Sequence, residues 1–195
     1  MIINILFVFL FYINFIFCQL TGSVGPTTKT SKKSTICNVL DYGGKADNKT
    51  DIGPFIVNTF KNCVIKKKYT SLYIPDGNYL LKSQVLLNGN GFQSWTFRLD
   101  GLITASSPSK YNSFNGNMFF IRNTGDFEMY SSNKKGAIQG QGYVYRNIPN
   151  QPGRSTWPRM VRILNCKNCS IHDLLLVDSP SFHLIVSGSY NIEVY

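Results

Sequence analysis

The five residues Lys167-Asn-Cys-Ser-Ile171 recur 23 positions later as Tyr190-Asn-Ile-Glu-Val194, and Gly125-Asp-Phe-Glu-Met129 alternates polar and apolar residues in the same way. A repeat in the twenties with one such strand per copy is typical of a solenoid, in which each turn stacks its strands on the turn before. Two more apolar runs, Ile171–Val177 and Leu184–Val186, lie between the later copies, so one turn holds about three short strands. The repeat therefore predicts an all-β chain folded as a parallel β-helix.

The chain after Leu72 agrees with this prediction, because short runs rich in β-branched and aromatic residues alternate with turns of Gly, Asn, Asp and Ser. We expect strands at 72–81 (broken by a turn), 84–87, 95–99, 101–104, 118–122, 127–130, 137–139 and 162–164. The Asn-Gly pairs at 88–89 and 90–91 leave a β-sandwich as the alternative, since Asn-Gly is typical of the tight turns of antiparallel hairpins.

One helix is predicted, over Asp51–Val64. The apolar residues at 52, 55, 56, 60, 63 and 64 share one helical face, Asp51 is placed to be the N-cap, and Pro54 is tolerated in the first turn. A solenoid needs its open end covered, so we expect this face to cap the first turn. No such cap is visible at the other end, and the β-helix is expected to be incomplete at its C-terminal end.

The first residues are typical of a secretion signal. Residues 1–17 carry no charged side chain, are mainly Ile, Phe, Leu and Val, and precede a polar segment. This predicts a signal peptide at 1–18, with an uncleaved signal anchor or a lipidated Cys18 as alternatives. Residues 19–36 then form an extended polar segment and 37–195 one domain. We expect a secreted, extracellular protein with no membrane contact after signal cleavage.

In a secreted chain the cysteines favour disulfides. Cys37 and Cys63 flank the predicted helix, and pairing them constrains a loop of 26 residues, for about 3 kcal/mol. Cys166 and Cys169 form a lone C-x-x-C, for which a local disulfide or two buried thiols are expected. A zinc site needs a second pair or suitably spaced histidines, and a redox site needs a thioredoxin-like context, so no metal is predicted.

Two glycosylation sequons and a positive net charge bear on possible partners. The sequon at Asn48 lies in a polar turn and is expected to be used, whereas Asn168 lies beside the possible disulfide and is disfavoured. The formal charge is +10, with basic clusters at 32–33, 66–68 and 134–135. Such a surface attracts polyanions such as acidic polysaccharides, although each cluster alone is typical of a solvated turn. No nucleic-acid motif accompanies the clusters, so no nucleic acid is expected as a partner.

Two segments near the end carry a resemblance to a known enzyme family. They are Lys135-Gly-Ala-Ile-Gln-Gly-Gln-Gly-Tyr-Val-Tyr145 and Leu176-Val-Asp-Ser-Pro-Ser-Phe-His183. Together with the Asp-x-Thr-Asp motif before the helix, they make the chain from about Gln19 to Tyr195 resemble the N-terminal part of the pectin-degrading glycoside hydrolases of family 28. Within that polygalacturonase and rhamnogalacturonase family, rhamnogalacturonase is the more similar. The helix motif is common to many β-helix proteins, whereas the Gly-Gln-Gly and Ser-Pro-x-Phe-His segments in this order are fairly specific.

The resemblance implies a right-handed parallel β-helix that hydrolyses pectin, either rhamnogalacturonan or polygalacturonan, with inversion. It also implies that the enzyme needs no cofactor and is a monomer when full length. Inversion needs a carboxylic acid and a carboxylate about 6.5–9.5 Å apart. In the family these groups follow the Ser-Pro-x-Phe-His strand, and twelve residues follow His183 here, so no catalytic residue is expected within these 195 residues.

Asp178 and His183 are the candidate substrate-binding residues. Asp178 precedes Ser-Pro, where Asp is the rhamnogalacturonase-like choice, and it would bind sugar hydroxyls or tune the catalytic carboxylates if it faced the cleft. An ordinary turn aspartate bonded to its own backbone is equally compatible. His183 is placed near the substrate floor, although a structural histidine is more common on a strand. Gly140 and Gly142 are expected to allow a tight turn.

Two other functions stay open. One is a β-helix that binds acidic polysaccharide without cleaving it, or an inactive remnant. The reading frame would end at Tyr195 in that case, whereas it would continue for the hydrolase. A β-helix lyase, which cuts acidic polysaccharide by elimination and usually uses calcium, is disfavoured by the two family segments.

Overall fold

The computed structural model describes residues 35–108, 114–148 and 156–195. The predicted signal peptide at 1–18 and residues 19–34 of the polar segment lie outside the described residues. Within these ranges every strand pairing is parallel. No helix in the described part combines the length and the apolar character that a membrane crossing requires.

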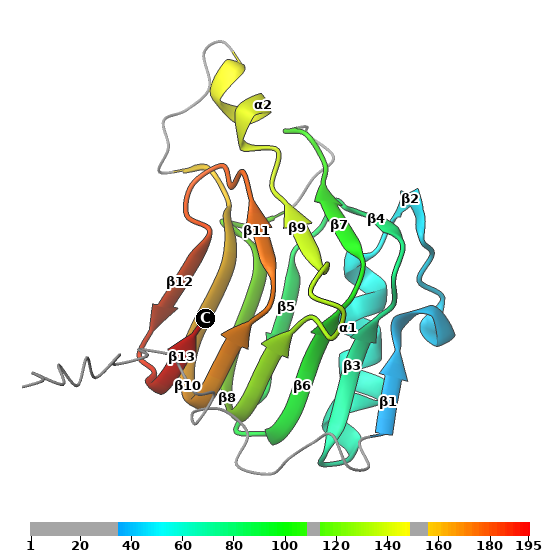
Figure 1. Ribbon diagram of the computed structural model, residues 1–195, viewed down its shortest axis with the longest axis vertical. Coiled ribbons are helices and arrows are strands. Elements are labelled where there is room, and N and C mark those ends of the chain that lie inside the picture. The colour runs from blue at the N-terminus through cyan, green and yellow to red at the C-terminus, as the bar shows by residue number, and fades with distance from the viewer. Residues whose placement is uncertain (1–34, 109–113, 149–155) are drawn as a thin grey trace, which may run out of the picture.

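The strands form two sheets, and the chain passes back and forth between them (Figure 1). The eight-stranded sheet holds β1 Thr35–Asn38, β3 Thr70–Ile74, β5 Val85–Asn88, β6 Gln93–Leu99, β8 Asn117–Tyr130, β10 Arg159–His172, β12 Leu184–Ser187 and β13 Tyr190–Val194. The five-stranded sheet holds β2 Asp47–Asp51, β4 Asn78–Leu81, β7 Leu102–Ala105, β9 Ala137–Gln139 and β11 Leu175–Val177. Successive turns of the chain therefore stack on one another.

This arrangement excludes the β-sandwich alternative. The two Asn-Gly pairs at 88–91 lie between β5 and β6, which do not pair with each other. Both strands pair instead with β8, in parallel. The two strands expected at 118–122 and 127–130 are a single strand, β8. Its first part pairs with β5 and its last part pairs with β6.

The residues that repeat in the sequence are paired with one another in the larger sheet. Lys167 on β10 pairs with Tyr190 on β13 and with Gly125 on β8. Inward-facing residues therefore form aligned layers. One layer is Trp95, Phe127, Cys169 and Ile192, and another, in the smaller sheet, is Tyr79, Ile103, Ile138 and Leu176. The 23-residue spacing thus corresponds to one full turn.

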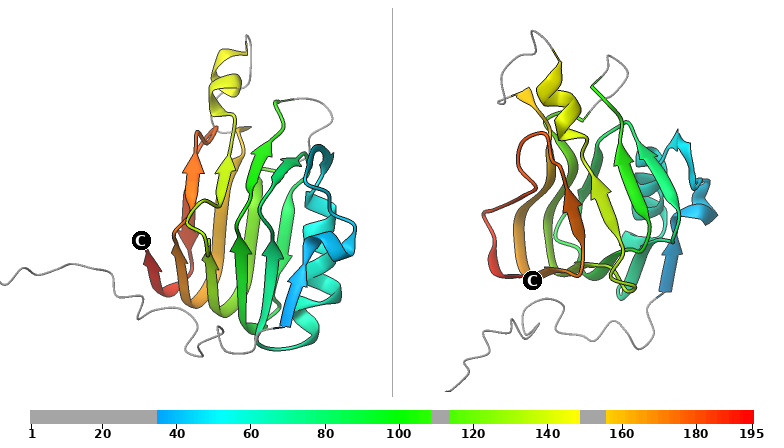
Figure 2. Two further views of the ribbon diagram at one scale, coloured as in Figure 1. Left: turned by 45° about the vertical axis from the view of Figure 1, so that its right-hand side comes forward. Right: turned by 45° about the horizontal axis from the view of Figure 1, so that its top comes forward.

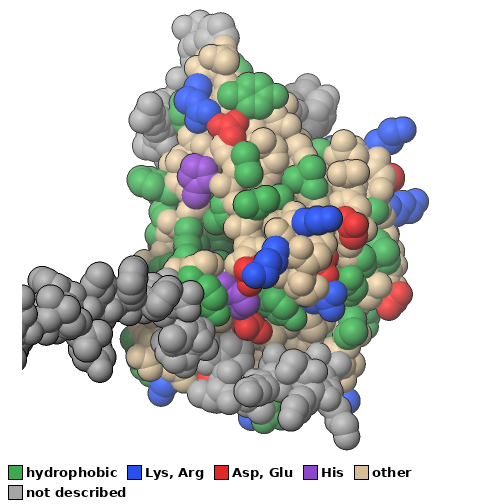
Figure 3. Space-filling view, in the orientation of Figure 1, with side chains coloured by type: hydrophobic (Ala, Val, Ile, Leu, Met, Phe, Trp, Pro, Cys, Tyr) green, Lys and Arg blue, Asp and Glu red, His purple; other side chains and the backbone are tan. Residues whose placement is uncertain are grey.

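The apolar layer of the last turn is less buried than the layers before it. Its members Leu176, Leu184, Val186 and Ile192 are only partly buried, although they pack against the core. In Figure 3 hydrophobic side chains are visible at the surface on the side of β12 and β13. The stack therefore presents a partly open apolar layer at this end.

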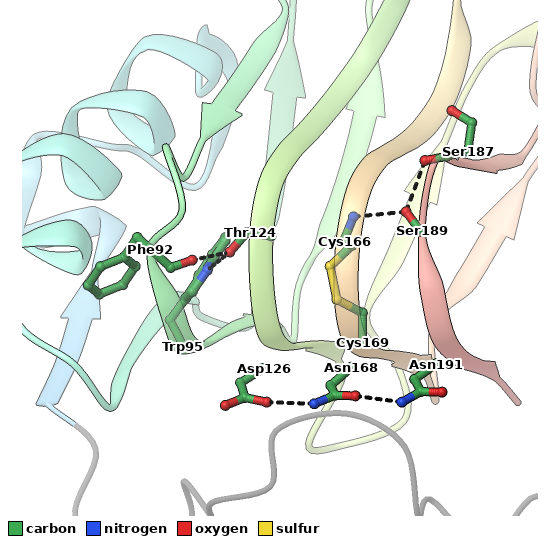
Figure 4. Close-up of a disulfide and its surroundings, with 10 residues drawn as sticks. All are labelled: Phe92, Trp95, Thr124, Asp126, Cys166, Asn168, Cys169, Ser187, Ser189 and Asn191. Carbon is green, nitrogen blue, oxygen red and sulfur yellow. Dashed lines mark hydrogen bonds between the residues drawn. A yellow bond between two sulfur atoms is a disulfide. The ribbon is translucent and has the colours of Figure 1, made fainter.

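Asparagine side chains line the bends of the long strands. Asn168 and Asn191 have left-handed φ values of 54° and 53°, which asparagine tolerates better than most residues. Asn168 donates a hydrogen bond to Asp126 (3.2 Å) and accepts one from Asn191 (2.9 Å; Figure 4). A second ladder joins Asn88, Asn123 and Asn165. A glycan on Asn168 would be attached to Nδ2, the atom that donates to Asp126, so it would compete with this bond of the first ladder.

The predicted helix is α1, Gly53–Asn62, at the end of the stack that holds β1 (Figures 1 and 2). The prediction that Asp51 is its N-cap is wrong, because Ile52 takes that position with helical backbone angles. The Asp51 carboxylate instead accepts the N–H groups of Gly53 (3.1 Å) and Lys82 (2.8 Å). It therefore ties the start of α1 to the end of β4.

The disulfide between Cys37 and Cys63 is confirmed, with Cα atoms 5.9 Å apart. It joins β1 to the C-terminal end of α1, beside the short 3-10 helices η2 (Val39–Tyr42) and η3 (Val64–Lys66). The buried face of α1 includes Ile56 and Phe60, and the Phe60 ring lies 5.1 Å from that of Trp95. The helix is thus attached covalently and by packing to the first turns.

Candidate functional site

The segment Asp178–His183 forms a compact loop between β11 and β12. The Ser179 hydroxyl donates to the Phe182 carbonyl oxygen (2.8 Å), and the Ser179 N–H donates to Nε2 of His183 (3.2 Å). The Phe182 carbonyl also accepts the N–H of Met160 (2.9 Å). The loop is therefore held both by its own bonds and by the start of β10.

A short helix, α2 (Gly142–Asn147), begins against this loop and was not expected from the sequence. Its first N–H, from Gly142, donates to the Asp178 carbonyl oxygen (2.7 Å). A Cβ on Gly142 would lie 2.5 Å from the Ser179 carbonyl oxygen, and one on Gly140 would lie 2.7 Å from that of Asp178. The left-handed residue of this turn is Gln141, with φ of 59°. The two glycines therefore serve the close approach of two backbone segments.

Asp178 holds α2 with its side chain. Its Oδ2 accepts the N–H of Tyr143 (2.9 Å), and its Oδ1 pairs with the guanidinium group of Arg146. Partial burial raises the pKa of Asp178, but these two donors outweigh it, so the pKa lies below its ordinary value. Asp178 is an ionised anchor for a helix 35 residues earlier in the chain and not a turn aspartate bonded to its own neighbours.

A pocket of about 400 Å³ opens beside the loop. Its described lining consists of Arg146, Arg159, Ser179, Pro180, Ser181, Phe182 and His183. Two of these side chains are cationic and none is acidic. In Figure 3 a basic and an acidic side chain lie together near the top of this face, with a histidine below them. The pocket is therefore suited to polar or anionic ligands.

The structure brings both predicted binding residues into one loop, but only His183 lines the pocket. Its Nε2 accepts an N–H, so neutral His183 carries its proton on Nδ1. Among the described residues, no hydrogen-bond partner occurs for Nδ1. Sequence analysis missed Arg146 and Arg159, because they come from α2 and β10 and no spacing relates them to the loop.

Cys166 and Cys169 form a disulfide within β10 (Figure 4). Of the two expected alternatives, a local disulfide and two buried thiols, the structure has the disulfide. Cys169 belongs to the buried layer that includes Trp95 and Phe127. Across the ranges that the structure describes, no group of three or more His, Cys, Asp or Glu side chains is placed to hold a metal ion. Both cysteines are buried, so the disulfide lies in the core.

A second group of titratable residues surrounds His172 at the end of β10. Its Nε2 lies 3.0 Å from Oε1 of Glu128, and its Nδ1 lies 2.9 Å from Oδ2 of Asp173. The ring stacks on those of Tyr195 (4.8 Å) and Tyr130 (5.5 Å). Both nitrogens face carboxylate acceptors, which favours the doubly protonated ring. The pKa of His172 is raised, mainly by the hydrogen bond to Glu128, although burial acts in the opposite direction.

We expect this cluster to make the chain more stable at mildly acidic than at weakly alkaline pH. Because the folded-state pKa of His172 is raised above the ordinary value of about 6.5, the stabilisation is fully present below that pH. It is lost as the pH rises through the folded-state pKa. The expected size is about 1 kcal/mol, that of a partly exposed ion pair.

Urea unfolding of the wild type and of His172→Gln across this pH range measures the effect. The decline in the free energy of unfolding with rising pH should be present in the wild type and absent in His172→Gln. His183→Gln removes the other histidine and should keep the decline. Equal declines in the wild type and His172→Gln would exclude His172 as their source.

Comparison with known proteins agrees with the resemblance. The family model described as "Glycosyl hydrolases family 28" matches residues 63–195. "Probable rhamnogalacturonase E" of Aspergillus niger is 45% identical over 189 residues, which cover 96% of this chain and 39% of that protein. "Rhamnogalacturonase B" of Aspergillus niger is 40% identical over 179 residues, covering 91% of this chain and 30% of that protein. The chain thus spans well under half the length of these relatives.

A solved structure supports the fold. The crystal structure of a "putative glycosyl hydrolase" from Parabacteroides merdae superposes with a TM-score of 0.63 at 16% sequence identity. The superposition covers 82% of this chain and 74% of that one. At this identity the likeness concerns the path of the backbone alone.

Proposed function

Because the chain belongs to glycosyl hydrolase family 28, we propose that it forms the N-terminal part of a secreted enzyme that hydrolyses pectin with inversion. Its substrate is rhamnogalacturonan or polygalacturonan. The observation that carries the proposal is the loop Asp178–His183, which builds a polar pocket on the family's Ser-Pro-x-Phe-His segment. The rhamnogalacturonase names of the relatives favour rhamnogalacturonan.

The proposed domain is a right-handed parallel β-helix of which residues 37–195 form the N-terminal portion, capped by α1. Further turns would stack on β11, β12 and β13. Support comes from the partly buried side chains of the last turn, whose counterparts in earlier turns are fully buried. Support also comes from the relatives, of which the matched residues cover 30–39%.

Secretion is proposed from the signal-like residues 1–18 together with the disulfides Cys37–Cys63 and Cys166–Cys169. Disulfides of this kind persist in oxidising compartments. Asn48 is exposed, as an N-glycosylated residue must be. The secreted enzyme would act as a monomer on its polysaccharide, without a cofactor and without contact to membrane or nucleic acid.

His183 and Asp178 have different roles in this proposal. The Nδ1–H of His183 would donate to a sugar hydroxyl in the pocket. The Asp178 carboxylate would keep α2 and Arg146 in place, through its bonds to Tyr143 and Arg146. Asp178 thus acts mainly on the shape of the pocket, and contact with the sugar is a secondary role for its free lone pairs.

We expect the 195-residue chain to release no reducing sugar from rhamnogalacturonan or polygalacturonate. Inversion needs two carboxylates, whereas no described residue that lines the pocket is acidic and Asp178 is paired with Arg146. A reducing-end assay on the purified chain checks this, with an Aspergillus niger rhamnogalacturonase as the positive control. Sugar release above the blank would contradict the prediction.

The same assay separates the alternatives when it is applied to a form of the protein that continues beyond residue 195. Reducing sugar with no unsaturated product indicates the hydrolase. Unsaturated product that disappears with a calcium chelator indicates a lyase. A form that binds the polysaccharide but cleaves none of it would favour the non-catalytic binding protein.

A further inference from the structure

We infer that Arg159 makes the pocket selective for a sugar that carries a carboxylate, and that its guanidinium group pairs with that carboxylate. The inference rests on the proposed function, which supplies a polysaccharide as the ligand. It goes further by assigning one side chain to one chemical group of the sugar.

Arg159 is the pocket cation whose charge is not already matched. Arg146 pairs with Asp178, and its Nη1 also lies 3.5 Å from the Ser179 carbonyl oxygen. Within the described residues, the Arg159 side chain donates one hydrogen bond, from Nη1 to the Gly116 carbonyl oxygen at 3.4 Å, which is long for such a bond. All ten acidic residues of the chain lie in the described ranges, and none of them forms an ion pair with Arg159 there.

The backbone places Arg159 beside the loop before any ligand binds. Arg159 is the first residue of β10, and its own N–H donates to the Gly116 carbonyl oxygen (3.0 Å). The next residue, Met160, donates to the carbonyl oxygen of Phe182 (2.9 Å). Since both contacts are made by backbone groups, the position of Arg159 beside the loop does not depend on a ligand.

The groups around Arg159 match a sugar ring with one acidic substituent. Phe182 is 59% exposed and offers an apolar face to the C–H groups of a ring. The Nδ1–H of His183 and the hydroxyl of Ser181 are hydrogen-bond partners for ring hydroxyls. A guanidinium group matches a carboxylate in bidentate geometry. A neutral sugar would leave Arg159 without that partner, so the preference for an acidic sugar should depend on this residue.

The test compares two ligands that differ in charge and not in their rings. Digalacturonate is ionised near neutral pH, and its methyl ester is not. Binding of each to the 195-residue chain is measured by calorimetry or NMR titration, for the wild type and for Arg159→Gln. We expect the wild type to bind the acid about tenfold more tightly than the ester, a size typical of a charge-assisted hydrogen bond. In Arg159→Gln the two affinities should become about equal, through loss of affinity for the acid.

Two further variants separate the role of Arg159 from general effects of charge or folding. Arg162→Gln removes an arginine of the same strand that is not among the residues lining the pocket, and it should keep the tenfold preference. Arg159→Lys keeps the charge without the planar fork and should keep only part of the preference. Circular dichroism and the thermal midpoint establish that each variant is folded.

Equal binding of acid and ester by the wild type would overturn the inference. The proposal that the pocket binds a pectic sugar would not be affected. A preference for the acid that survives Arg159→Gln would overturn the role of this residue. If the folded wild type binds neither compound, the inference fails together with the proposal that this pocket takes a pectic sugar.

Discussion

Replacing Trp95 with alanine is expected to lower the free energy of unfolding by about 3–5 kcal/mol, the largest effect among the substitutions considered. Trp95 is fully buried, with its ring 5.1 Å from Phe60 of α1 and 4.4 Å from Phe127 of β8. Its Nε1–H donates to Oγ1 of Thr124 (2.8 Å; Figure 4). Alanine would leave a cavity where the helix meets two turns of the stack. Chemical denaturation followed by circular dichroism measures the change.

Trp95→Phe is the matched control, because phenylalanine keeps most of the apolar volume and removes the bond to Thr124. We expect it to cost about 1–2 kcal/mol, from that lost hydrogen bond and a smaller cavity. A loss below about 1.5 kcal/mol for Trp95→Ala would mean that the surroundings of Trp95 collapse around the smaller side chain.

Gly142→Ala is expected to cost about 3 kcal/mol and to disturb the pocket. The new Cβ would lie 2.5 Å from the Ser179 carbonyl oxygen and 2.8 Å from that of Asp178. Both neighbours are backbone atoms of the loop, so relief requires the loop or α2 to move. Overpacking of this kind costs about 1–3 kcal/mol, and movement would also weaken the bond between Tyr143 and Asp178 (2.9 Å), for about 1 kcal/mol more.

The measurement is again chemical denaturation, together with NMR shifts of the two histidines. His183, which accepts the Ser179 N–H, should shift in Gly142→Ala, and His172 should not. Gly91→Ala is the control, since a Cβ there meets nothing within 4 Å. It should cost about 1 kcal/mol, from the positive φ alone. Similar losses for both variants, with no shift of His183, would show that the approach of α2 to the loop is not tight.

The sequence was sufficient for those parts of the fold that leave a periodic pattern of apolar residues in the chain. The repeat of Lys167–Ile171 at Tyr190–Val194 predicted the pairing of β10 with β13, because every turn of a stack repeats the same inward and outward alternation. The helical face that includes Ile56 and Phe60 predicted α1 for the same reason. The prediction of Asp51 as the N-cap was wrong. Its carboxylate accepts the N–H of Lys82, in the next turn of the stack, as well as that of Gly53.

The candidate site could be predicted only in part. Asp178 and His183 were identified from the Ser-Pro-x-Phe-His segment, but their partners were not. Helix α2 has six residues, too few for a periodic signal, and it begins where Asp178 accepts the Tyr143 N–H. No pattern in the sequence around Arg159 identifies it, and the role proposed for it rests on its place in the pocket.

By itself the sequence determined the parallel stack, the 23-residue length of the turn from β10 to β13, the helix α1 and the disulfide Cys37–Cys63. Hydrophobic periodicity and turn chemistry are local properties, and they are legible in the order of residues. Only the tertiary structure decided that Asp178 anchors α2, that Gly142 must lack a side chain, and that Arg159, Phe182 and His183 line one pocket. These contacts leave no periodic signal in the sequence, because their geometry depends on how each turn settles on the one before it.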